Sequence, residues 1–183
     1  LRLRQITSGF IKDEEGNHHN VGSSKIDAIK SLVHDTLEAE RRIVIFAEFR
    51  WEVAAITEAL AKKGTQVWPV TGDTPPAQRV DIRKKFGDTG PGSVDRMVIV
   101  AQIKTLSVAV NELVSASHAI FTTPTQQRDD YIQARDRLNR VGQTRPVTYW
   151  HMQVPGSIDE LVMHRLDSRT ELENTLLNHI YKK

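Results

Sequence analysis

The stretch Ile43–Ala47, which reads IVIFA, is a short continuous apolar run rich in β-branched residues. Such a run is typical of a strand covered on both faces, as in the middle of a parallel sheet. Four further stretches predict strands: Gln66–Val70, Arg96–Ala101, His118–Thr122 and Val147–His151. Because Pro69 cannot donate a hydrogen bond to a neighbouring strand, the first of these four is expected to be less central.

Helical patterns separate the predicted strands. Apolar residues take up helical spacing from Ser24, a second helix is expected to stop at Gly64, and the prolines of TGDTPP open a third. Helical spacing returns from Ser157 with an interruption near Asp167–Thr170, which predicts one bent helix or two. Because parallel strands need crossover connections, this alternation predicts an α/β fold with a mostly parallel central sheet flanked by helices.

Length and composition indicate one domain. The chain has 183 residues, 39% of them hydrophobic, which suffices for one core. Residues 1–22, with the polar run DEEGNHHNVG, are expected to form a flexible leading segment with little structure, and residues 23–183 the domain. The start LRLRQITSGF lacks the features of a signal peptide and looks like a cut from a longer protein, and no apolar run approaches a membrane span. We therefore expect a cytoplasmic protein without a membrane partner.

Composition excludes some kinds of site. The chain has no cysteine, so disulfides and thiolate metal sites are excluded. His18 and His19 lie in a polar stretch without partner ligands at a suitable spacing, so we expect solvated side chains and no metal. The net charge of +2 is too small to predict nucleic-acid binding, because an anionic polymer is held by local basic patches.

The stretch Gln133–Pro146, QARDRLNRVGQTRP, is the most unusual one. It puts Arg137 and Arg140 three residues apart, and therefore on one face if the segment is helical. Two guanidinium groups suit the polyphosphate of a nucleotide and can stabilise charge on a transferring phosphoryl group. Alternatively, Asp136 and Arg140 form a surface ion pair on a solvated helix. Spacing alone leaves both interpretations open.

The pattern Q-A-x-D-R-x-x-R-x-G-Q resembles motif VI of SNF2-type helicases of superfamily 2. Further segments match the family in the same order: SSKIDAI resembles its lead-in helix, RIVIFAEF its motif IV, VTGDTPPAQR its following turn, RMVIVAQIKTLSVAVNEL its motif V, and GSIDELVMHRL the segment after motif VI. The resemblance covers about Leu3 to Leu177, and its departures from the common pattern are similar to those of phage-type members of the family.

The resemblance implies the second RecA-like domain of an ATP-dependent DNA helicase or translocase, in a bacterial or phage-infected cell. Arg137 and Arg140 would be arginine fingers that reach ATP bound on a first domain outside this chain. Gln133 would order the nucleotide side of the cleft, and Asn111 would lie near the ribose or link the ATP state to DNA contact. ATP and Mg²⁺ would be held mainly by the first domain, which is the expected partner together with DNA.

Five other residues are expected, by the same resemblance, to lie towards the nucleic-acid backbone: Thr71, Gly72, Arg79, Gln102 and Lys104. Phosphate contacts of this kind give affinity without sequence reading. For the two cations in the set, an ordinary surface charge is an equally good interpretation.

The sequence also departs from the family. Leu106, Ser107 and Ala109 stand where motif V usually carries glycines, and FTTPTQQRDDY lacks the usual tryptophan. No G-x-x-x-x-G-K-[ST] loop and no DExH-like acid pair occur, so the isolated domain is expected not to hydrolyse ATP. A non-catalytic module that binds DNA or protein is therefore the alternative to a motor domain. A stand-alone nucleotide enzyme ranks last, because no Gly-rich phosphate loop opens any helix.

Overall fold

A five-stranded parallel sheet forms the centre of the computed structural model, which describes residues 1–61, 65–88, 90, 96–107 and 112–168. The strand order is β4 (Thr65–Val70), β5 (Arg96–Gln102), β3 (Arg42–Ala47), β6 (His118–Phe121) and β7 (Thr148–His151). All neighbouring strands run parallel. The α/β fold is confirmed, with β3 in the middle and the proline-containing β4 at one edge.

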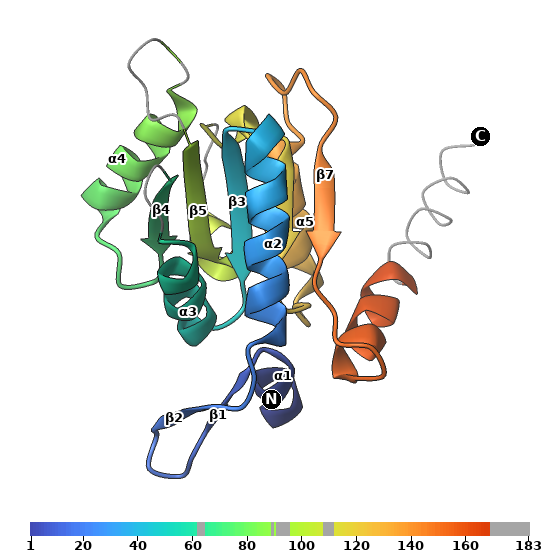
Figure 1. The fold of residues 1–183 in the computed structure, drawn as a ribbon. Coiled ribbons are helices and arrows are strands. Elements are labelled where there is room, and N and C mark those ends of the chain that lie inside the picture. The colour runs from blue at the N-terminus through green and yellow to red at the C-terminus, as the bar shows by residue number, and fades with distance from the viewer. Residues whose placement is uncertain (62–64, 89, 91–95, 108–111, 169–183) are drawn as a thin grey trace, which may run out of the picture.

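Helices cover both faces of the sheet (Figure 1). The helices α2 (Ser24–Ala39) and α3 (Arg50–Leu60) lie on one face. The other face is covered by α4 (Pro76–Gly87), α5 (Arg128–Leu138) and the 3-10 turns η1 (Ile103–Ser107) and η2 (Glu112–Ser115).

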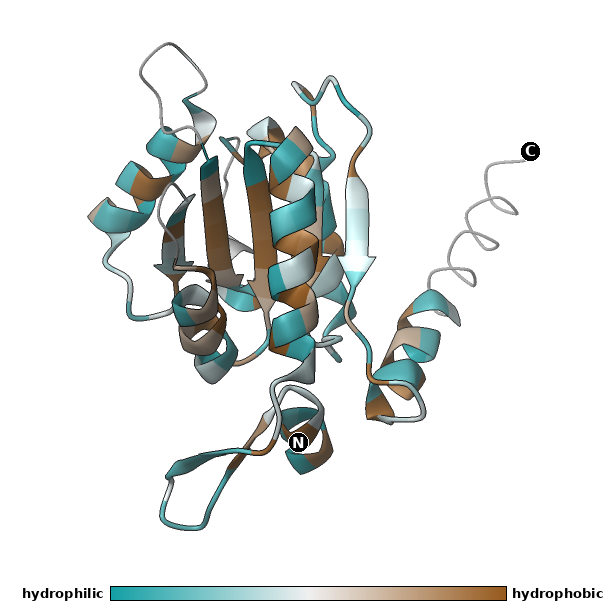
Figure 2. Ribbon diagram, in the orientation of Figure 1, coloured by the Kyte–Doolittle hydropathy of each residue, from teal (hydrophilic) through white to brown (hydrophobic). Residues whose placement is uncertain are grey.

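Successive side chains of a strand point to opposite faces of the sheet, and this alternation explains the two apolar layers of the core. In β3, Ile43 and Ile45 pack towards α2 and α3, whereas Val44 and Phe46 pack towards α4 and α5. Every residue of β3 is buried, as the continuous apolar run predicts. Figure 2 shows the consequence: apolar strands lie between helices whose outer faces are hydrophilic.

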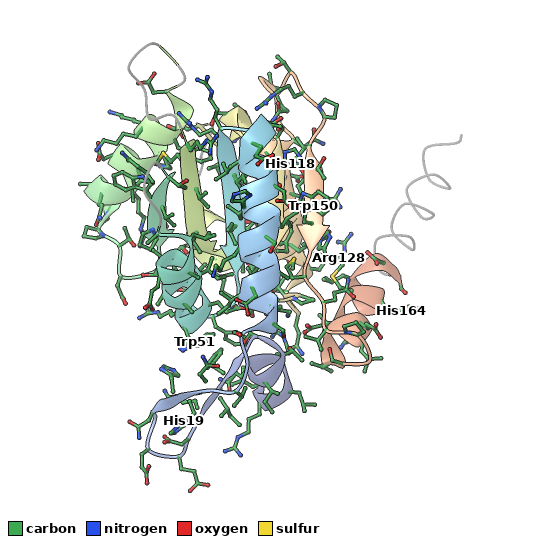
Figure 3. The ribbon with its side chains drawn as sticks, viewed as in Figure 1. His19, Trp51, His118, Arg128, Trp150 and His164 are labelled. Carbon is green, nitrogen blue, oxygen red and sulfur yellow. The ribbon has the colours of Figure 1, made fainter. Side chains whose placement is uncertain are left out.

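The leading segment has regular structure. It forms α1 (Arg2–Thr7) and an antiparallel hairpin of β1 (Phe10–Lys12) and β2 (His18–Asn20) beyond the carboxyl ends of the sheet strands (Figure 1). The expectation of little structure there is wrong. The cause is tertiary contact: Phe10 is buried and stacks on Trp51 of α3, with ring centroids 4.7 Å apart. Trp51 accordingly lies beside the hairpin (Figure 3).

A buried ion pair ties the lead-in helix to the last described segment, residues 158–168, which are helical. Lys25 Nζ lies 2.7 Å from Asp159 Oδ2, with only 6% and 0% of the two side chains exposed. Asp159 also accepts hydrogen bonds from the Thr7 hydroxyl at 2.8 Å and the Val154 backbone N–H at 3.2 Å. Residues 169–183, over which the sequence predicts further helical structure, lie outside the described residues.

A second polar cluster lies where β3 and β6 end. The buried Glu52 accepts four hydrogen bonds: from the hydroxyls of Thr122 at 2.9 Å and Thr123 at 2.6 Å, and from the backbone N–H groups of Glu48 and Phe49 at 3.0 Å each. Burial raises the pKa of Glu52, and these donors act in the opposite direction. The side chain thereby joins the start of α3 to the end of β6.

Within the part of the chain that the structure describes, no helix is long and apolar enough to cross a bilayer.

Candidate functional site

The helix α5 fixes the direction of the residues that the sequence singles out. Tyr131, Ala134 and Leu138 of this helix are buried against the sheet. Their spacing of three and four residues determines which side of the helix faces outward. Gln133 is exposed on that outer side and Arg137 is half-buried there.

Both candidate finger arginines border one open depression of about 510 Å³. Its lining consists of Gln133, Asp136, Arg137, Asn139, Arg140 and Val141. The helix ends at Leu138, so Arg140 belongs to the turn after α5 and not to the helix itself. The structure thus brings the two arginines and Gln133 together, through a helix and a turn.

The alternative surface ion pair is absent from the described structure. Asp136 and Arg140 form no ion pair with each other in the described structure, although both border the depression. Their carboxylate and guanidinium are exposed. The guanidinium of Arg140 is therefore available to an anionic ligand, which the simple surface-pair interpretation does not allow.

The turn that carries Arg140 is shaped by Gly142 and Gln143. Gly142 has φ 106°, a left-handed conformation that residues with a Cβ rarely adopt. The Gln143 side-chain amide donates to the carbonyl oxygens of Ala116 at 2.8 Å and Val114 at 3.1 Å. The glycine and glutamine of motif VI thus hold the turn in place, a role that the sequence did not reveal.

Arg135 of α5 has a structural role. The Arg135 guanidinium lies over the rings of Tyr131 and Tyr149, at 5.6 and 5.3 Å from their centroids. The Tyr149 hydroxyl donates to the Arg135 carbonyl oxygen at 2.9 Å. Burial raises the pKa of both phenols, so they stay neutral. This packing fastens α5 to β7.

Four of the five residues predicted to face nucleic acid lie where the two strands β4 and β5 end. Thr71 and Gly72 follow β4, Gln102 ends β5, and Lys104 is exposed on η1. Because the two strands are parallel neighbours, these ends meet at the same edge of the sheet. Ligands of open α/β sheets bind at this carboxyl edge.

Arg79 has a structural role in the same region. Its Nε donates to the Thr74 carbonyl oxygen at 2.7 Å, and a terminal nitrogen donates to the Gly72 carbonyl oxygen at 2.8 Å. The guanidinium therefore braces the turn between β4 and α4. A contact of Arg79 with phosphate would have to form beside these bonds.

The two groups of predicted site residues do not border one common depression. The depression of Arg137 and Arg140 is not lined by the residues at the ends of β4 and β5. They are linked through packing, since α5 contacts η1, which carries Lys104. Asn111 and Ala109 lie outside the described residues, as do the side chains of Leu106 and Ser107.

Metal-binding chemistry is a separate question. Among the described residues no group of three or more His, Asp or Glu side chains could hold a metal ion. His19 Nε2 instead lies 2.7 Å from a carboxylate oxygen of Asp13, and this contact is the main cause that lowers the pKa of Asp13 to about 2. The guanidinium donors of the arginine pair suit phosphate oxygens, and Asp136 is the one carboxylate among the lining residues of the depression, so Mg²⁺ would need further ligands from elsewhere.

Comparisons with known proteins identify the family of the chain. The family described as helicase conserved C-terminal domain matches residues 24–142. The chain is 30% identical over 154 residues to the DNA repair protein RAD5 of Yarrowia lipolytica, covering 84% of this chain and 14% of that protein. It is 25% identical over 177 residues to an ATP-dependent helicase of Mycoplasma pneumoniae, covering 97% of this chain and 16% of that protein.

A solved structure extends the comparison to the fold. The C-terminal part of the Fun30 ATPase domain superposes with a TM-score of 0.68 at 25% identity, over 84% of this chain and 48% of that one. The fold is therefore RecA-like, as expected. The chain spans only 14% and 16% of the lengths of these two relatives.

Proposed function

The chain belongs to the helicase conserved C-terminal domain family, with SNF2-type relatives, and from this premise we propose that it is the second motor domain of an ATP-dependent DNA helicase or translocase. In this proposal Arg137 and Arg140 act as arginine fingers towards ATP bound on a first RecA-like domain. Gln133 and Asn111 contact the nucleotide from the same side.

The observation that carries the proposal is the shared depression bordered by both arginines. The Arg140 side chain is exposed and makes no ion pair with Asp136, and its turn is held by Gly142 and Gln143. A guanidinium offers planar, permanently charged donors that match phosphate oxygens. Donors fixed in advance can stabilise negative charge that develops on a transferring phosphoryl group.

Nucleic-acid contact is the second part of the proposal. Thr71, Gly72, Gln102 and Lys104 would contact the DNA backbone from the carboxyl ends of β4 and β5. Polar side chains and backbone N–H groups at such an edge bind phosphates without reading sequence. Arg79 would contribute mainly by bracing the turn that presents Gly72.

The other groups that ATP hydrolysis requires would be provided outside this chain. Mg²⁺ and most of the contacts to ATP would come from the first domain, which is also the expected partner, so the isolated domain would not hydrolyse ATP. The phage-type membership and the cytoplasmic location remain predictions from the sequence.

The test is DNA-stimulated ATPase activity of the longer protein that carries this domain. Arg137→Ala and Arg140→Ala are each expected to lower turnover by about 10³-fold or more while DNA affinity is retained, because arginine fingers contribute on that order. Arg165→Ala, at an exposed position on the helix of residues 158–168, is the matched control.

Unchanged turnover in both finger variants, with the control also unchanged, would remove the finger assignment. Absence of any ATPase activity in the longer protein, with DNA or protein binding intact, would favour the non-catalytic module. The residues in place of the motif V glycines are the sequence feature that favours this second candidate.

A further inference from the structure

Gln143 makes more hydrogen bonds than any other residue of the turn after α5. Besides its two bonds to Ala116 and Val114, its amide nitrogen lies 3.4 Å from the Leu138 carbonyl oxygen. Its side-chain oxygen accepts from the Arg145 backbone N–H at 3.0 Å. Its own backbone N–H donates to the Arg140 carbonyl oxygen at 2.9 Å. A single half-buried side chain thus holds both ends of the turn that carries Arg140.

The anchor points of Gln143 lie in and next to η2. Val114 belongs to this 3-10 turn, and Ala116 follows it directly. The sequence segment that resembles motif V runs into η2, and its first part, on β5 and η1, contains Gln102 and Lys104. The hydrogen bonds of Gln143 therefore connect the turn of Arg140 to the end of motif V.

Little else fixes this turn. Val141 is 100% exposed, and Gly142 is exposed as well. A residue that buries no surface contributes no packing that would hold the turn. The other described anchor is Arg145, which donates to the Ser115 carbonyl oxygen at 2.9 Å and pairs with Glu40. The contact with Ser115 also ends on η2, whereas Glu40 follows α2, so Gln143 and Arg145 both tie the turn to η2 and Arg145 alone ties it to α2.

We propose that Gln143 is a positioning residue that transmits the position of η2, and hence of motif V, to Arg140. Contact of motif V with nucleic acid would then determine the position of the Arg140 guanidinium. The position of this group would in turn determine the rate of ATP turnover. The inference rests on the proposed function, since it needs Arg140 to act on ATP. Its physical basis is the set of hydrogen bonds by which the Gln143 side chain ties the turn of Arg140 to Val114 of η2 and to the adjoining Ala116.

The test is Gln143→Glu in the longer protein. The change keeps the size of the side chain but replaces its N–H donors by an oxygen that faces two carbonyl oxygens, which leaves those acceptors unsatisfied. We expect the ratio of ATP turnover with DNA to turnover without DNA to fall about ten-fold. The KM for ATP and the Kd for DNA are expected to stay within about two-fold, because Gln143 contacts neither ligand in the proposal.

Thr144→Ala is the matched control, since Thr144 is the exposed neighbour in the same turn and its hydroxyl makes no hydrogen bond in the described structure. This variant should keep the ratio. If Gln143→Glu does not fold, Gln143→Met removes the donors without adding charge and should give the same fall in the ratio.

A purely structural role gives a different result. In that case the melting temperature falls and turnover with and without DNA drops by the same factor, so the ratio is unchanged and the inference is overturned. Arg140→Ala in the same assay separates the coupling role of Gln143 from the assignment of Arg140 as an arginine finger. If Arg140→Ala abolishes turnover while Gln143→Glu keeps the ratio, only the coupling inference fails; if Arg140→Ala has no effect, the finger assignment itself fails.

Discussion

Asp159→Ala leaves the Lys25 ammonium in a buried site without its counter-charge. The two charged atoms lie 2.7 Å apart, and Lys25 keeps only a long contact of 3.4 Å to the Thr123 hydroxyl. At an effective dielectric constant of about 20, two unit charges at this distance attract by about 6 kcal/mol. Desolvation of both groups offsets much of that attraction in the native pair, but removing one partner of a buried pair costs about 3–5 kcal/mol. We expect a loss of unfolding free energy in that range.

Urea denaturation of the chain measures this loss, with Asp81→Ala as the control. Asp81 pairs with Lys85 on α4 at the similar distance of 2.9 Å, but both side chains are about half exposed. Exposed pairs of this spacing contribute about 0.3–0.5 kcal/mol. The difference between the two variants therefore reports burial, because the separation of the charges is nearly the same.

Two results would contradict the claim that the unpaired charge of Lys25 causes the loss of stability. The first is a cost for Asp159→Ala below about 1 kcal/mol, similar to that of the exposed pair. The second comes from the double variant Lys25→Met with Asp159→Leu, which removes both charges and should recover most of the loss. If the double variant is as unstable as Asp159→Ala alone, the cost comes from the lost hydrogen bonds of Thr7 and Val154 and not from the charge.

Three other measurements test single groups. Glu52→Ala should lower the unfolding free energy by about 3 kcal/mol, because buried donors lose their common acceptor; thermal melting measures this. The carboxyl of Asp13 should titrate at about 2 in an NMR experiment, and His19→Gln should move the midpoint up towards 3.8. Burial lowers the pKa of His151 below 6.5 in the folded chain. As the pH falls, the unfolded chain therefore binds a proton at His151 before the folded chain does, and the free energy of unfolding should decrease below about pH 6.5. His151→Gln should flatten that part of the stability curve in denaturation experiments between about pH 5 and 8.

The sheet could be predicted from the sequence because its information is local. Apolar runs such as Ile43–Ala47 mark buried strands wherever they occur, and Pro69 marks an edge. The leading hairpin could not be predicted, since its strands are three residues each and are held by contacts such as the stacking of Phe10 on Trp51. Phe10 and Trp51 are 41 positions apart in the sequence (51 − 10). Helical and strand periodicities relate only residues a few positions apart, so they cannot predict this contact.

The candidate site was predictable only in part, because some of its residues carry a local sequence pattern and others are defined only by contacts between distant parts of the chain. The pair Arg137 and Arg140 carries a residue pattern, and the structure puts both arginines at one depression. The roles of Arg79 and Gln143 depend on backbone carbonyl groups as acceptors. Every residue has a carbonyl group, so such a partner leaves no mark in the sequence.

The most direct test of the central claim is a structure of the longer protein with ADP and aluminium fluoride, which imitates the transferring phosphoryl group. We expect the guanidinium groups of Arg137 and Arg140 both to lie within about 3 Å of the fluoride ligands, at the distance of a charge-assisted hydrogen bond. A closed, nucleotide-bound structure in which both arginines remain in solvent, or in which other cations contact the fluoride, would contradict it.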